Sequence, residues 1–130
     1  MKPKGITPLE GEEQAFLFTW ARFATQTYPE LSLLFHIPNG GSRHPAEAVN
    51  LKRQGVRKGV PDIFLPVARG GYHGLFVELK RKNGGRVQAE QMNWIQELNA
   101  QGYLALVVRG GDRAIDLLTK YIKGELKTNA

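Results

Sequence analysis

The sequence predicts an α/β fold in one domain: a mixed sheet of about four strands flanked by helices, in the order α-β-α-β-β-α-β-α. Segments with apolar residues at helical spacing alternate with short apolar runs of strand length, and glycine- and proline-rich breaks separate them. A length of 130 residues suits one domain and one packed core. We expect that core to cover residues 9–122, between short flexible termini.

The first predicted helix covers residues 9–27, because an apolar stripe recurs there at helical spacing: Leu17, Trp20, Ala21 and Ala24. Glu10 and Glu13 lie before this stripe. Acids are favoured at a helix N-terminus by the helix dipole, so a purely structural role explains them as well as a role in a functional site.

A strand is predicted at residues 31–37, and the turn residues 38–41 end it. A short second helix follows at residues 45–54, with Pro45 suited to its first position and Gly55 to its C-terminal end.

Residues 60–67 and 75–80 predict a β-hairpin whose strands carry unexpected charges. Asp62 lies near the start of the first strand and Glu78 lies inside the second. Glu78 and Lys80 are two residues apart, so they project from the same face of a strand. The hairpin can bring Asp62 beside them. Buried charges are costly unless something binds there, and a divalent cation is the obvious candidate.

The second half of the chain predicts a helix at residues 88–99, a strand at 103–108 and a last helix from Gly111 or Asp112 to Tyr121. In the helix at 88–99 we expect four side chains to pack inward: Met92, Trp94, Ile95 and Leu98. The strand is a continuous apolar run, which is typical of burial on both faces. The polar residues after 122 predict a frayed tail.

Composition excludes several kinds of protein. The chain has no cysteine, which rules out disulfides, thiolate zinc sites and cysteine nucleophiles, and suits a reducing cytosol. It has no apolar run of membrane-spanning length, and its first residues lack the apolar region of a signal peptide. We therefore expect a cytoplasmic protein with no membrane partner.

Positive charge is concentrated around the hairpin. Residues 43–86 hold ten Lys or Arg and three acids, a net charge of +7, whereas the rest of the chain has eight basic and nine acidic residues, a net charge of −1. A basic surface around an acidic centre suits a polyanionic substrate, although a solvated basic face explains the charge excess alone equally well. We expect nucleic-acid contacts from His36, Asn39, Gly40, Arg43, Lys52, Arg53, Arg57, Lys58, Arg81, Lys82 and Arg86. A structural His36 and a plain turn at residues 38–41 are the alternatives.

Pro61-Asp62 followed by Glu78-Leu79-Lys80 resembles the motif of the PD-(D/E)XK nuclease superfamily. The amino-acid sequences of residues 59–63 and 76–80, with Gln91 early in the next helix, resemble its VRR-NUC family still more closely, notably the small stand-alone phage and bacterial members. Residues 10–20 and 36–41 share that resemblance, which covers roughly residues 10–108.

The resemblance implies a restriction-endonuclease-like core and a Mg²⁺- or Mn²⁺-dependent endonuclease that acts on branched DNA, not on a small molecule. Small stand-alone members are similar to dimeric Holliday-junction resolvases, so a homodimer is expected. Asp62, Glu78 and the backbone carbonyl of Leu79 are then metal ligands, Lys80 assists the chemistry, and Gln91 binds water or phosphate. The family pattern favours Glu10 as a further acid, and the apolar stripe admits Glu13 equally.

Three alternatives stay open. A nuclease of the same superfamily with flap or replication-fork preference has the same motif. A non-catalytic DNA-binding module keeps the fold without turnover, although the intact set of Asp62, Glu78 and Lys80 argues against it. A basic α/β domain in which Glu78 and Lys80 form a structural ion pair is the least specific reading.

Overall fold

The computed structural model of the chain describes residues 8–38 and 44–129, with side chains from Gly11 onward. Its elements confirm the predicted α/β class and order, with a short 3-10 helix added: α1 (Pro8–Ala24), η1 (Pro29–Leu33), β1 (Phe35–His36), α2 (Pro45–Arg53), β2 (Ile63–Leu65), β3 (Leu75–Lys80), α3 (Ala89–Ala100), β4 (Leu104–Arg109) and α4 (Gly111–Ile122).

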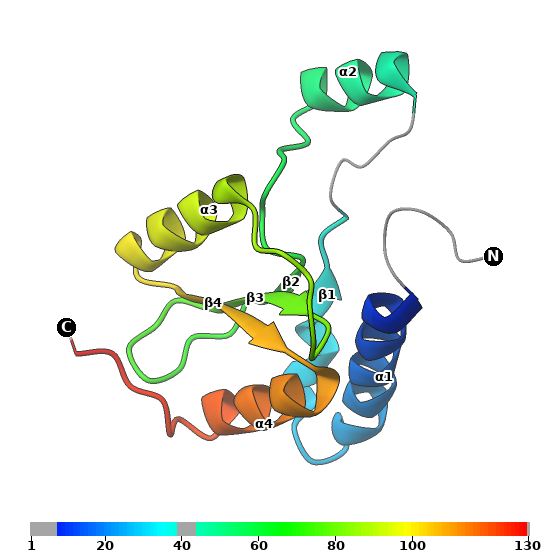
Figure 1. Cartoon of the computed structure of the whole chain (residues 1–130). Coiled ribbons are helices and arrows are strands. Elements are labelled where there is room, and N and C mark those ends of the chain that lie inside the picture. The colour runs from blue at the N-terminus through cyan, green and yellow to red at the C-terminus, as the bar shows by residue number, and fades with distance from the viewer. Residues whose placement is uncertain (1–7, 39–43, 130) are drawn as a thin grey trace.

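The four strands form one mixed sheet in the order β1-β2-β3-β4. β1 pairs antiparallel with β2, β2 pairs antiparallel with β3, and β3 pairs parallel with β4. The parallel pair requires a crossover, and α3 supplies it. Helices α1 and α4 lie on one side of the sheet and α3 on the other (Figure 1). None of the helices in the described ranges is long and apolar enough to cross a bilayer.

The two faces of β3 differ because its side chains alternate. Leu75, Val77 and Leu79 are buried with Leu17 of α1 and Leu118 of α4, and they form the main core. The opposite face carries a row of aromatic rings, in which Phe64 stacks on Phe76 with ring centroids 4.1 Å apart. Glu78 and Lys80 lie on the same face of β3 as Phe76, as their spacing of two residues predicts, and they occupy the C-terminal end of that strand.

Two strands are shorter than predicted. The run 31–37 begins instead in η1, because Pro29 fixes a helical φ at its start, and only Phe35 and His36 remain as β1. The run 60–67 contains only three strand residues. Pro61 and Pro66 flank β2 and lack the N–H that a ladder position must donate.

Two burial predictions were wrong. The strand at 103–108 is not buried on both faces: β4 forms an edge of the sheet, and Leu106 and Val107 are only half-buried. Met92 was expected inside, yet it is 41% exposed, because α3 turns Gln91 and Ile95 toward the sheet at a spacing of four. A polar side chain therefore takes the inward position next to Met92.

Two segments lie outside the layered body. α2 stands away from the sheet (Figure 1), and none of its residues is buried. The C-terminal segment returns to the β2–β3 turn: Thr128 N–H donates to Gly70 O at 2.9 Å, and Leu126 packs against the core. The polar composition of residues 123–130 did not predict this contact.

Candidate active site

Glu78 lies at the centre of the candidate site. It is only 3% exposed, on the same face of β3 as Lys80. Its Oε2 is 3.3 Å from Nζ of Lys80 and 2.9 Å from Nε2 of Gln91. Removing two charged groups from water costs several kcal/mol unless their partners compensate. The site therefore holds a buried ion pair in a fixed geometry.

Asp62 meets Glu78 through strand register. Ile63 pairs with Val77, so the residue before β2 stands opposite Glu78. Oδ1 of Asp62 accepts a hydrogen bond from Leu79 N–H at 3.0 Å. In extended backbone the N–H and C=O of one residue point to the same edge, so the Leu79 carbonyl also faces the side of β3 where Asp62 lies. The hairpin thus brings Asp62 beside Glu78, as its two strands predicted, and the Leu79 carbonyl faces the same edge.

β1 holds the backbone of Asp62. The Asp62 carbonyl accepts Ile37 N–H at 2.7 Å and lies 2.8 Å from Nδ1 of His36. A carbonyl oxygen only accepts, so the His36 ring carries a proton on Nδ1. His36 therefore positions the residue just before β2, Asp62, which agrees with the structural alternative for this histidine.

Gln91 is fixed at both ends of its side-chain amide. Its Oε1 accepts Gln88 N–H at 2.8 Å, and its Nε2 donates to Glu78. The first contact is half of a capping box at the start of α3, and Gln88 supplies the other half. The two glutamines lie three residues apart in the sequence. A glutamine three residues after the N-cap is typical of a capping box. The sequence did not predict this cap because glutamine is not one of the usual N-cap residues.

Gly59 sets the approach of the Asp62 segment to α3. Its φ is +94°, and a Cβ there would lie 2.7 Å from Cβ of Glu90 and 2.8 Å from the Glu90 carbonyl carbon. Only glycine allows the chain to lie this close with this φ. Because Glu90 precedes Gln91, this contact fixes the Asp62 loop against the helix that holds Glu78.

Of the two candidate acids of α1, Glu10 and Glu13, the structure describes the side chain of Glu13 only. Glu13 lines a hollow of about 430 Å³ with Glu12, Phe16, Arg81, Lys82 and Asn83, so it lies beside the residues that follow Lys80. Glu12 is exposed. Glu10 lies in the first turn of α1, and its side chain is outside the described part of the structure.

A divalent cation fits the donor set at Asp62 and Glu78. Carboxylate and carbonyl oxygens are the ligands that Mg²⁺ and Mn²⁺ prefer. Within the described residues, no three His, Asp or Glu side chains are grouped closely enough to hold a metal ion. Among the described residues, the oxygen donors placed together at the end of the hairpin are those of Asp62, Glu78 and the Leu79 carbonyl.

Comparison with known proteins agrees with this geometry. The model of the VRR-NUC domain matches residues 11–112. The chain belongs to the VRR-NUC family. A solved structure described as a VRR_NUC domain protein is 33% identical, with a TM-score of 0.77 over 94% of this chain and 93% of that one. No curated protein matched the chain. The family match indicates a nuclease of the PD-(D/E)XK type, and such a domain binds DNA.

Two of the basic residues that this VRR-NUC domain was expected to use for DNA contacts also contact the protein itself. Arg57 lies over the Trp94 ring, 5.7 Å from its centroid, and Lys58 Nζ is 3.8 Å from Glu90. Lys52 and Arg53 end the projecting helix α2, where both are exposed. Asn39, Gly40 and Arg43 lie outside the described residues.

Arg109 is a residue that the sequence analysis missed. Its guanidinium donates to the carbonyls of Gly84 and Gly85, the latter at 3.0 Å, and so holds the loop of residues 81–86. That loop carries Arg81, Lys82 and Arg86, three of the expected DNA contacts. An arginine directly after the predicted apolar strand at residues 103–108 is the only local signal of this role.

Proposed function

We propose that this VRR-NUC protein is a divalent-metal-dependent endonuclease that hydrolyses phosphodiester bonds in branched DNA, with four-way junctions as its preferred substrate. The observation that supports the chemistry is the convergence of Asp62, Glu78, Lys80 and Gln91 at the end of β3. The preference for junctions rests on the resemblance to small stand-alone members of the family.

Asp62, Glu78 and the Leu79 carbonyl hold Mg²⁺ or Mn²⁺ in this proposal. When bound, the cation stabilises negative charge on the scissile phosphate and lowers the pKa of water for attack. Gln91 keeps Glu78 in place, because its own amide is tied to the start of α3. Such supporting hydrogen bonds orient metal ligands and tune the affinity of a site.

Lys80 acts at the reacting phosphate. Its ammonium lies 3.3 Å from Glu78, so it reaches the group that holds the cation. It orients the attacking water and offsets the charge that grows on the phosphoryl oxygens. The water loses a proton as its oxygen bonds to phosphorus, the bond from phosphorus to O3′ breaks with its electron pair on O3′, and O3′ takes up a proton from solvent. The products are a 5′-phosphate and a 3′-hydroxyl.

The DNA backbone is bound chiefly by the exposed residues Lys52, Arg53, Lys82 and Arg86, with the half-buried Arg81 beside them. Contacts of this kind position a duplex without reading its sequence, and they weaken steeply with salt. A homodimer is part of the proposal, because two sites related by a two-fold axis suit two strands of a four-way junction.

The test uses a labelled four-way junction, a flapped duplex and a linear duplex of the same strand length, each with Mg²⁺ and with chelator. We expect Mg²⁺-dependent cleavage that is fastest on the junction, and gel filtration at the mass of a dimer. Faster cleavage of the flap overturns the junction preference. Binding of all three substrates without cleavage overturns the enzyme and leaves a DNA-binding module.

A further inference from the structure

The outer edge of β4 offers backbone groups to an additional strand. Leu104 N–H donates to Gly74 O and Gly110 N–H donates to Lys80 O, so even-numbered residues face β3. Odd-numbered residues therefore direct N–H and C=O toward the open edge. At Ala105 the side-chain amide of Asn99 pairs with both groups at 2.9 Å. In the described part of the chain, no such partner meets Val107.

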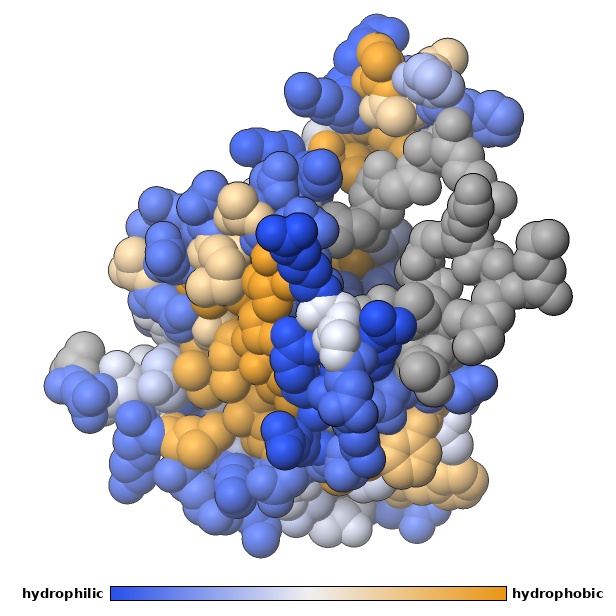
Figure 2. All heavy atoms as spheres, viewed as in Figure 1, coloured by the Kyte–Doolittle hydropathy of each residue, from blue (hydrophilic) through white to orange (hydrophobic). Residues whose placement is uncertain are grey.

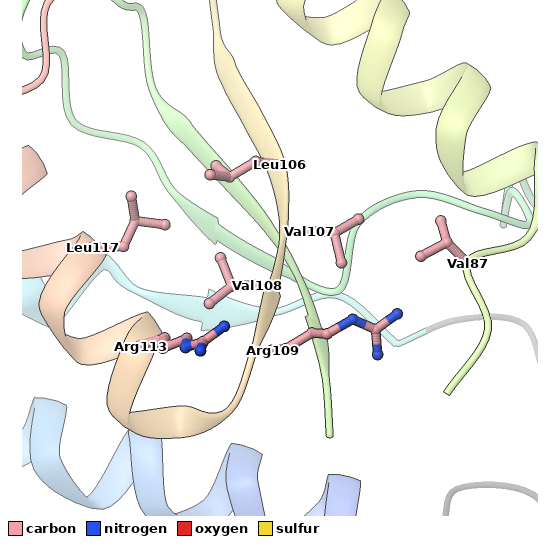
Figure 3. A pocket seen from close by; sticks show the side chains of 7 residues that line it. All are labelled: Val87, Leu106, Val107, Val108, Arg109, Arg113 and Leu117. Carbon is pink, nitrogen blue, oxygen red and sulfur yellow. The ribbon is translucent and has the colours of Figure 1, made fainter. Parts of the chain in front are cut away.

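A hollow of about 560 Å³ surrounds this edge and extends to both faces of the sheet. Leu106, Val108 and Leu117 lie on one side of β4, and Val107 and Val87 lie on the other (Figure 3). The space-filling view shows an apolar surface here, over β4 between α3 and α4, with hydrophilic residues around it (Figure 2). An added strand sends alternate side chains to the two faces, so it would cover both halves of the hollow.

Two arginines close the same hollow, one on each face. Arg109 lies on the side of Val107, and Arg113 lies on the side of Leu117 (Figure 3). Arg109 donates to backbone carbonyls, which carry no net charge. The nearby acids Asp112 and Asp116 pair with Lys82 and Lys120 instead. No ion pair joins either arginine to a carboxylate within the described residues, so both retain a positive charge for a ligand.

We propose that the β4 edge is a docking site for an extended peptide segment of a partner protein. The segment adds a fifth strand beside β4. It carries apolar residues at successive positions, which cover the two faces in turn, and a pair of adjacent acids that meet Arg109 and Arg113. The inference is independent of the nuclease substrate proposed above.

Charge favours this occupant over a second copy of the chain. In a symmetric pairing of two β4 edges, each copy would offer the other a strand, Leu104–Arg109, that carries no carboxylate, so Arg109 and Arg113 would gain no opposite charge from it. Asn99 also occupies Ala105 in each copy, which shortens any ladder between two β4 strands. Duplex DNA would satisfy the arginines but not the apolar hollow.

The test uses two fluorescein-labelled ten-residue peptides with a central run of valine and threonine, one ending in two glutamates and one beginning with them. We expect one of them to bind saturably, by fluorescence polarisation, and to slow hydrogen exchange at the Val107 amide. N-methylation of alternate peptide residues separates strand addition from general stickiness. Methyl groups on the residues that face β4 should weaken binding roughly tenfold or more, and methyl groups on the intervening residues should not.

Arg113→Glu should also weaken binding about tenfold, whereas Lys127→Glu, an exposed charge reversal elsewhere, should not. An acid in the first turn of α4 suits the helix dipole, so the variant should fold. The proposal fails if neither peptide binds, if both methylation patterns act alike, or if Arg113→Glu has no effect. It also fails if Val107 exchange slows with protein concentration alone, which indicates a second copy, or with duplex DNA alone.

Discussion

The side-chain amide of Gln91 donates to Oε2 of Glu78 at 2.9 Å, the same oxygen that lies 3.3 Å from Nζ of Lys80. The other end of that amide accepts Gln88 N–H, so the start of α3 and the carboxylate on β3 are joined through one side chain. The position of Glu78 therefore depends on the helix cap as well as on its own strand.

Gln91→Leu should raise the Mg²⁺ concentration needed for half-maximal cleavage by roughly 10- to 100-fold, because Glu78 loses the group that orients it. DNA binding in chelator should change little. The control is Gln96→Leu, the same chemical change at an exposed position of the same helix. An unchanged Mg²⁺ requirement would show that Gln91 does not tune the metal site.

Lys80→Met should leave the Glu78 carboxylate buried without the ammonium group that pairs with it. Breaking a buried pair from one side costs about 3–5 kcal/mol, so we expect the unfolding free energy in chelator to fall by that amount. Mg²⁺ should then stabilise the variant more than it stabilises the wild-type protein. Urea unfolding with and without Mg²⁺ measures both effects.

The matched control is Lys120→Met, which breaks the exposed pair with Asp116 and should change stability by no more than about 0.5 kcal/mol. If Lys80→Met is as stable as the control in chelator, the Lys80 ammonium does not stabilise the buried Glu78 carboxylate.

Gly59→Ala should lower both stability and cleavage. An added Cβ collides with Glu90 at 2.7 Å and separates the Asp62 loop from α3. Gly55→Ala is the control: its φ of +101° is equally unfavourable for alanine, but no atom lies within 4 Å of the added Cβ. Both variants should lose about 1–3 kcal/mol from backbone strain. Thermal unfolding should show a further loss in Gly59→Ala alone, and equal losses would contradict the packing role.

Tyr121→Phe tests the main core. The buried hydroxyl donates to Val67 O at 2.6 Å, so its removal should cost about 1 kcal/mol at neutral pH. Burial raises the pKa of Tyr121 above its ordinary value. The unfolded phenol therefore ionises first, and the wild-type protein loses stability as pH rises above about 10. The phenylalanine variant lacks this loss, so the difference in unfolding free energy between the wild-type protein and the variant should narrow above about pH 10. A difference that widens instead would contradict the assigned shift.

The sequence predicted the α/β order and the two-residue spacing of Glu78 and Lys80 because both follow from local periodicity. The predictions from the sequence were wrong where the position of a segment in the fold decides its burial. An apolar run such as that of β4 has the same composition at an edge of a sheet as in its centre. The roles of Gly59 and Arg109 could not be predicted, since each depends on a segment distant in the chain, Glu90 for the first and residues 84–85 for the second. His36 likewise meets Asp62 only through strand pairing.

The most direct test of the proposed chemistry is Asp62→Asn. Asparagine keeps the oxygen that accepts Leu79 N–H but removes the charge that a cation requires. The measurement is cleavage of a labelled four-way junction at saturating Mg²⁺, with binding of the same junction followed in parallel. We predict that cleavage is abolished while binding is unchanged or tighter. Cleavage at the wild-type rate in the variant would contradict the metal site at Asp62 and Glu78.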